Sequence, residues 1–236
     1  NLKYLGDIIM QKLTKSSALS IISNLGIGLV LVGLVIGMSF ASPVFLKTNN
    51  IVNILLQVAT ISIIATGMTY VILTGGIDLS VGSIVALSAV CLGTFIHAGM
   101  KWIGQDPSQF MVLLVVALSI IGAILVGTMC GLINGFVIVC MKVPPFIATL
   151  GMMGIARGLA LTIAGGKTLY SFPQSLRYLG NGKIPVTESF SLPVPVIIAF
   201  AVVMVSYYVL TQTRFGRQIY ALGGNREAVR LSGINV

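Results

Sequence analysis

FMVLLVVALSIIGAILVGTMCGLINGFVIVCM, residues 110–141, is a run of 32 residues without a charged side chain. An α-helix needs about 20 apolar residues to cross the roughly 30 Å of hydrocarbon in a bilayer. At about 1.5 Å per residue, a helix over this run would reach roughly 48 Å. We therefore expect a membrane helix that is tilted, broken or extends past the membrane, with Gly131 and Gly135 as natural places for a break.

The composition of the whole chain agrees with a membrane protein. Hydrophobic residues make up 56% and charged residues 8%, whereas a soluble domain carries about 25% charged residues. The net charge of +9 would suggest a nucleic-acid partner in a soluble protein. Here the basic residues lie mostly in short loops between apolar runs, without interleaved aromatic residues, so we expect a lipid environment and no nucleic acid.

Five further apolar runs, free of charge except for Arg157, are long enough to span a bilayer. They cover residues 18–41, 51–73, 79–98, 146–164 and 193–212. The first is too long for the apolar core of a signal peptide, so it is interpreted as an uncleaved span. The six runs predict an all-α, polytopic transmembrane helix bundle with broken or re-entrant helices, in a single domain over residues 1–236.

Basic residues predict the orientation of the bundle. If both ends of the chain and the loop at Lys142 are cytoplasmic, the inside holds eight basic residues and the outside five. Cytoplasmic loops carry the excess of Lys and Arg, so we expect both ends inside. Residues 165–192 would then lie outside, either as a cap that faces a periplasmic partner or as a simple connection.

Small residues recur every four positions in the fourth run, at Ala123, Gly127, Gly131 and Gly135. Such stripes let helix backbones approach closely in lipid, where packing holds helices together. The pattern favours a compact bundle and is compatible with a dimer.

Residues 74–83, TGGIDLSVGS, interrupt a long apolar stretch. Gly75 and Gly76 break the helix, and Asp78 is placed to cap the next helix through the amides of Ser80 and Val81. The alternative is a gate or a buried ion pair, because ionisable groups at membrane depth are functional by default.

Arg157 lies near the middle of the fifth run, where an Arg costs about 2.5–3.5 kcal/mol on insertion scales. It therefore needs a partner, a wet cavity or a position nearer the surface. Asp78 is the first partner to test, because membrane-length apolar runs flank it on both sides. The alternative is a short or re-entrant fifth span with Arg157 at its outer end.

Uncharged polar side chains mark a candidate pathway for a polar solute. Such groups exchange hydroxyl partners without binding tightly, which suits a neutral polyhydroxylated molecule. The alternative is hydrogen bonding between helices. The candidates are Asn53, Gln57, Thr60 and Thr66 in the second run and Asn134 in the fourth.

Motifs for chemistry are missing from the sequence. It contains no Ser/His/Asp set, no HExxH and no GxxxxGK[ST]. The three cysteines fall inside apolar runs, and His97, the only histidine, lacks companion ligands. We therefore expect no catalytic site, no metal and no cofactor, and any ATP must bind to another chain.

The block GGNREAVRLSGINV, residues 223–236, ends the chain with a group of charges. Gly223 and Gly224 are interpreted as a flexible link, Asn225 as an N-cap and Glu227 as a first-turn acid. Ser232 and Gly233 would end a helix of about two turns. Its apolar side would be Ala228, Val229 and Leu231, with Arg226 and Arg230 at the rim of a partner's groove.

This block resembles the cytoplasmic coupling loop of ABC importer permeases, whose pattern is Glu-Ala-Ala, three residues, then Gly. Glu227, Ala228 and Gly233 keep the spacing, and Val229 replaces the second Ala. Without that spacing, an ordinary basic loop would be the simpler interpretation. The resemblance implies a coupling segment at 213–236 that contacts an ATPase through Gly224, Asn225, Arg226, Glu227, Ala228, Arg230, Ser232 and Gly233.

Two more blocks, MTYVILTGGIDLSVGSIVAL (68–87) and FIATLGMMGIARGLALTIAGGKT (146–168), extend the resemblance to the ribose/galactose/xylose class of ABC sugar permeases. The resemblance implies a bacterial inner-membrane subunit that transports a monosaccharide such as ribose. Its partners would be cytoplasmic ATP-binding subunits, a periplasmic sugar-binding protein and a second permease copy. Permeases of this class continue for several more helices, so we expect the chain to be truncated at its C-terminal side.

Two other classes compete with this interpretation. A secondary transporter would use Asp78 and Arg157 as an ion relay, but acids at membrane depth are scarce and the coupling-like block would have no role. An intramembrane enzyme lacks a nucleophile–base set.

Overall fold

The computed structural model describes residues 26–187 and 190–233. The chain divides into two units, Asn1–Ile54 and Leu55–Val236. In the first unit, the helix Gly26–Ala41 is followed by a turn in which Asn50 Nδ2 donates to the carbonyl oxygen of Phe45 at 2.8 Å. The run predicted for 18–41 is thus helical from Gly26, and its first eight residues lie outside the described part.

Five helices of the described chain are long and apolar enough to cross a membrane. They are α2 (Thr48–Leu73), α3 (Val81–Ile103), α4 (Gln109–Val139), α5 (Pro145–Ala164) and α7 (Val194–Gln212). Three short helices, α6 (Gln174–Asn181), α8 (Arg214–Gly224) and α9 (Arg226–Leu231), lie beside α7 in the sequence. The predicted all-α, polytopic class is confirmed.

One small sheet interrupts this helical pattern. Strands β1 (Lys183–Pro185) and β2 (Ser191–Pro193) pair antiparallel, with Lys183 opposite Pro193 and Pro185 opposite Ser191. Pro193 and Pro195 then start α7, because proline fits the first turn of a helix, where its missing N–H is not needed.

The long fourth run forms one uninterrupted helix. α4 passes through Gly131 and Gly135 with helical backbone, so the break considered at these glycines does not occur. Glycine lowers helix propensity by only about 1 kcal/mol, and the apolar neighbours outweigh that cost. α4 is therefore tilted or extends past the hydrocarbon.

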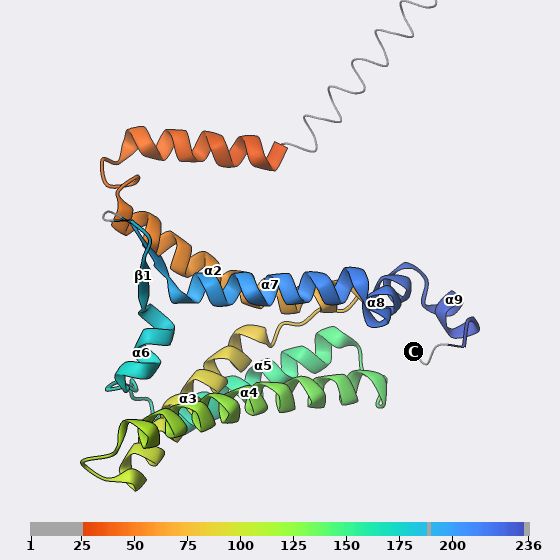
Figure 1. The fold of residues 1–236 in the computed structure, drawn as a ribbon. Helices are drawn as coiled ribbons and strands as arrows, with labels where there is room; N and C mark the ends of the chain where they lie inside the picture. Colours follow the sequence, from red (N-terminus) through yellow and green to blue (C-terminus); the bar gives the residue numbers. More distant parts are fainter. Residues whose placement is uncertain (1–25, 188–189, 234–236) are drawn as a thin grey trace, which may run out of the picture. The chain divides into compact units, whose positions relative to one another are not determined.

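α3, α4 and α5 pack into a three-helix bundle, in which they lie side by side (Figure 1). Their shared core contains Leu87, Cys91, Cys130, Met152 and Ala156. Gly127 allows the close approach predicted for the small stripe, since an added Cβ would lie 3.1 Å from Ser88 Oγ. Gly131 and Gly135 face open space instead, so only the first half of the stripe is used between these helices.

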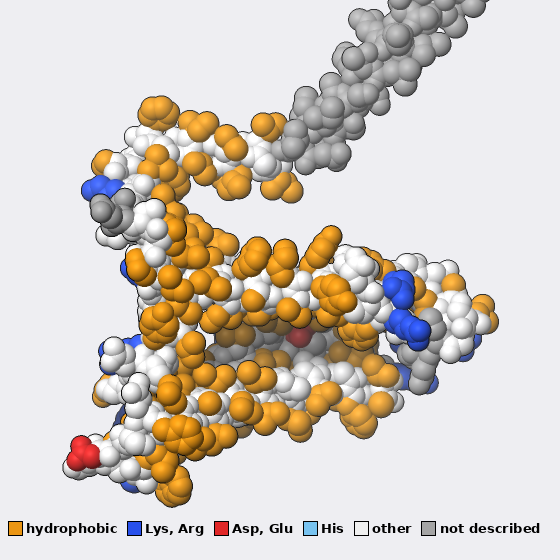
Figure 2. Space-filling model, in the orientation of Figure 1, with side chains coloured by type: hydrophobic (Ala, Val, Ile, Leu, Met, Phe, Trp, Pro, Cys, Tyr) orange, Lys and Arg blue, Asp and Glu red, His pale blue; other side chains and the backbone are white. Residues whose placement is uncertain are grey.

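α7 contacts α6 near its start and α8 at its end, which places these two short helices at opposite ends of the unit (Figure 1). Hydrophobic side chains cover the flanks of the long helices, and Lys and Arg gather around α8 and α9 (Figure 2). Because lipid solvates apolar side chains, this distribution fits helices that cross a membrane and end in water.

Candidate translocation and coupling site

The segment between α2 and α3 is held by a carboxylate. Asp78 Oδ1 accepts from the Ser80 amide at 2.8 Å and from Ser80 Oγ at 2.6 Å. Ser80 is fully buried and is itself the residue that precedes α3. The predicted cap therefore exists at the Ser80 amide, whereas the predicted second bond to Val81 is not formed in the described structure.

This carboxylate joins a buried polar network. Asn134 on α4 is 6% exposed and donates from Nδ2 to Ser80 Oγ at 3.0 Å. Thr149 on α5 is buried; its hydroxyl donates to Pro145 O at 2.8 Å and lies 3.4 Å from Ile77 O. Three helices thus converge on the 74–80 segment. Buried polar groups that are fully paired fix a unique arrangement, because an unpaired one is costly.

The polar residues predicted along α2 do not all meet. Asn53 belongs to the first unit, and Gln57 and Thr60 are exposed. Thr66 donates to Ser62 O at 2.7 Å and lines a hollow of about 500 Å³ with Tyr70 and with Ser206 of α7. Asn134 lies in the Ser80 network and not in this hollow. The proposed pathway residues therefore fall into separate groups.

Arg157 is not brought to Asp78. Its side chain is exposed on α5, and Asp78 is occupied by Ser80. Within residues 26–187 and 190–233, the one ion pair joins Glu227 to Arg230. The hypothesised Asp78–Arg157 pair is therefore not formed, because α5 presents Arg157 away from the core in which Met152, Ala156 and Ala160 are buried.

Contacts that the sequence did not predict hold α7 and α8 against the end of α2. Ser206 Oγ donates to the Tyr70 hydroxyl at 2.8 Å, and the ring of Phe215 in α8 stacks on Tyr70 at 6.4 Å between centroids. Gly223 packs directly on the carbonyl oxygen of Leu73, where a Cβ would clash. Leu73 and Gly223 are 150 positions apart, and only the Gly-Gly pair hints at a close approach.

The helix expected in the terminal block forms at Arg226–Leu231. Asn225 caps it, with Oδ1 accepting from the Ala228 amide at 3.0 Å. Glu227 lies in the first turn and bonds Arg230 at 2.6 Å. Gly233 takes a left-handed φ of 77°, which suits glycine. The N-cap and the glycine stop are confirmed.

Two details of that block were predicted wrongly. Gly223 and Gly224 are the last residues of α8 rather than a flexible link, because Gly223 is fixed against α2. Val229 is buried, so it is not part of an exposed apolar side. The surface left for a partner contains Arg226, Glu227, Ala228, Arg230 and Leu231, all exposed.

Comparison with known proteins identifies a family. Residues 50–236 match the family described as branched-chain amino acid transport system / permease component. The chain is 42% identical to the ribose import permease protein of Bacillus subtilis and 38% identical to that of Haemophilus influenzae, over 92% and 88% of its length. It is 35% identical to the galactose/methyl galactoside import permease protein of Escherichia coli over 96%. No solved structure matches.

The chain spans 62% and 60% of the two ribose permeases and 68% of the galactose permease. The resemblance drawn from residues 68–87, 146–168 and 213–236 is confirmed. Bacterial permease relatives and five spanning helices place the protein in a bacterial inner membrane as a multi-pass protein. The chain belongs to the family of permease components that includes these sugar importers.

Proposed function

We propose that this chain forms part of the membrane pathway of an ATP-driven importer for a monosaccharide such as ribose. The observation that carries the proposal is the terminal helix α9. It is capped by Asn225, ended by Gly233, and presents exposed charges at the water-facing end of the unit. Six residues cannot hold a helix alone in water, so α9 depends on the surface it packs against. A partner ATPase would complete that surface.

The contacts suggest how a movement of α9 would reach the membrane. α9 contacts α8, and α8 rests on the end of α2 through Phe215 and Gly223. α2 leads directly into the 74–80 segment, whose Ser80 is bonded to Asn134. We infer that a displacement of α8 and α9 shifts the end of α2 and strains the Ser80 network, which opens or closes the inner end of the pathway.

The proposed partners are those that the resemblance to the sugar permeases implies. Cytoplasmic ATP-binding subunits would contact residues 213–236, a periplasmic sugar-binding protein would deliver the solute outside, and a second permease copy would complete the pathway. No nucleotide motif occurs in the sequence, so ATP hydrolysis is assigned to the partner and the chain itself to transport. No cofactor is invoked. Lipid surrounds the exposed apolar flanks.

The experiment is co-purification of the ATPase with variants of the full-length protein. Gly233→Val forces a side chain into a left-handed backbone, and Glu227→Lys places a positive charge at a helix start. We expect normal membrane levels, weakened ATPase binding and little sugar uptake. Gly158→Ala is the matched control, since Gly158 lies on the exposed face of α5, outside residues 213–236, and an added Cβ there meets open space. Full ATPase binding and uptake in both test variants would refute the coupling role.

A further inference from the structure

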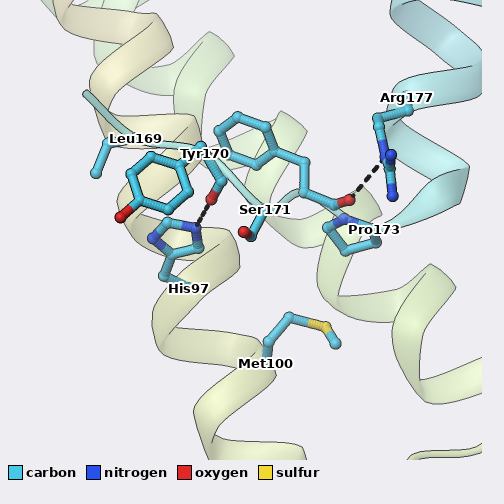
Figure 3. A pocket seen from close by; sticks show the side chains of 8 residues that line it. His97, Met100, Leu169, Tyr170, Ser171, Pro173 and Arg177 are labelled. Carbon is cyan, nitrogen blue, oxygen red and sulfur yellow. Dashed lines mark hydrogen bonds between the residues drawn. The ribbon is translucent and has the colours of Figure 1, made fainter.

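The loop between α5 and α6 borders an open pocket on the C-terminal half of α3. The pocket has a volume of about 830 Å³ and is lined by His97 and Met100 of α3, loop residues 169–173 and Arg177 of α6. Figure 3 shows His97 and Arg177 reaching the loop from two different helices. Small-molecule sites usually measure about 300–1,000 Å³ and combine apolar walls with a few polar groups.

The wall of this pocket is fixed in place by several contacts. His97 Nε2 bonds the carbonyl oxygen of Tyr170 at 2.8 Å, and the His97 ring stacks on Phe172 at 5.7 Å. Arg177 Nε donates to Phe172 O at 3.1 Å. Gly93 lets the loop sit on α3, because a Cβ there would lie 2.8 Å from Leu169 Cδ1. The loop is therefore organised before any ligand arrives.

The same contacts leave hydrogen-bonding capacity in the pocket. A carbonyl oxygen can only accept, so His97 Nε2 carries the hydrogen and Nδ1 of the neutral ring remains an acceptor. In the part of the chain described, no hydrogen bond engages the hydroxyls of Tyr170 and Ser171 or the terminal nitrogens of Arg177. Ser171 also holds a left-handed φ of 66°, which costs energy in a residue other than glycine.

The chemistry favours a neutral ligand rich in hydroxyl groups. The exposed Tyr170 ring and the stacked Phe172 ring offer apolar faces on which the C–H face of a sugar ring can pack. Hydroxyls can pair with Arg177, Ser171 and His97 Nδ1. Phe172 O accepts from Arg177 Nε, which leaves the two terminal nitrogens of Arg177 to donate to hydroxyl groups of a ligand.

We propose that this pocket is an outer sugar-binding subsite, which holds the monosaccharide at the mouth of the pathway before it enters. The location rests on the proposed function: the pocket lies at the end of the unit opposite to α8 and α9, which would face the cytoplasm (Figure 1). Tyr170 supplies the stacking face and Arg177 the main donors. His97 positions the loop through its bond to Tyr170 O.

Saturation-transfer NMR on the full-length protein in lipid nanodiscs, without ATPase subunits, tests the subsite with D-ribose and D-galactose. We expect transfer to at least one sugar from the wild type. Tyr170→Ala keeps the backbone bond to His97 and should weaken the affinity about five- to tenfold, and Arg177→Gln should act similarly. Tyr178 lies on α6 beside Arg177 but does not line the pocket, so Tyr178→Ala is the matched control and should bind sugar like the wild type.

Three results would overturn the subsite: no transfer to either sugar from the wild type, equal affinity in Tyr170→Ala and the wild type, or displacement of the sugar by millimolar inorganic phosphate, which would indicate an anion site. The importer is judged separately, by ATP-driven uptake after the partner subunits are added. Uptake by the wild type with no effect of Tyr170→Ala on binding rejects the subsite alone. Sugar binding that depends on Tyr170, without any ATP-driven uptake, supports the subsite and rejects the importer.

Discussion

Asn134 on α4 donates a hydrogen bond of 3.0 Å to Ser80 Oγ, and both residues are buried. The Ser80 hydroxyl in turn donates a hydrogen bond to Asp78 Oδ1, so one hydroxyl joins Asp78 and the start of α3 to α4. The start of α3 and the C-terminal part of α4 are thereby tied to the segment that follows α2. We regard this bond as the point at which a movement of α2 meets the rigid bundle.

Replacing the central hydroxyl tests this junction. Ser80→Ala leaves the buried Asn134 amide without its acceptor, and an unpaired buried group costs about 1–3 kcal/mol. We expect the free energy of unfolding to fall by that amount in a denaturation curve recorded in detergent. Thr128→Ala, on the exposed face of α4, should change it by less than about 0.5 kcal/mol. Equal stability of the two variants would contradict a structural role for Ser80.

Two adjacent glycines provide an internal comparison that tests the packing of α8 on α2. Gly223→Ala places a Cβ against the Leu73 carbonyl, whereas the same change at Gly224 meets open space. We expect Gly223→Ala to lower thermal stability, and Gly224→Ala to leave thermal stability unchanged or slightly raised, since alanine favours the helix. Melting curves measure both effects. Indistinguishable variants would show that α8 does not pack on α2.

Asp78 and Arg157 should act independently. The structure gives Asp78 two bonds to Ser80 and leaves Arg157 exposed. Asp78→Asn and Arg157→Gln should therefore have effects on stability that add within about 0.5 kcal/mol, as is usual for residues without a shared partner. A double-mutant cycle measures the coupling. A double variant that regains stability relative to Asp78→Asn would restore the ion-pair hypothesis.

The topology can be tested by labelling single cysteines. Exposed Gln174 lies in α6 and exposed Gln218 in α8, so the orientation predicted from basic residues places them on opposite sides of the membrane. Cys140 is exposed and would also react, so the variants are made in a Cys140→Ser background. A membrane-impermeant maleimide should then label Gln174→Cys from outside. Gln218→Cys should react only after the membrane is opened. Reaction of both from one side would reject the orientation.

The apolar runs predicted most of the fold because lipid imposes a simple rule on length and charge. α5 begins at Pro145, where the pair Pro144-Pro145 predicts a start. α3 continues past the predicted end to include Lys101, since a base near a helix C-terminus is favourable and can reach the interface. α8 escaped prediction because its Arg214, Gly216 and Arg217 do not resemble a membrane span.

The candidate site was predictable only where its contacts are local. The Asn225 cap and the bonds from Asp78 to Ser80 lie within three residues in the sequence. By contrast, the Tyr70–Ser206 hydrogen bond joins residues that are 136 positions apart in the sequence. The Asn134–Ser80 hydrogen bond joins residues that are 54 positions apart. Such pairs depend on how helices pack, which neither periodicity nor spacing specifies. For the same reason the sequence could not show that Val229 is buried.

The most direct test of the account is sugar uptake by the full-length protein in proteoliposomes with its ATPase and its sugar-binding protein. We predict ribose or galactose uptake that requires ATP, is blocked by vanadate, persists with a protonophore, and is lost in Gly233→Val but retained in Gly158→Ala. Uptake that proceeds without ATP and collapses with the protonophore would contradict the account and indicate an ion-coupled transporter.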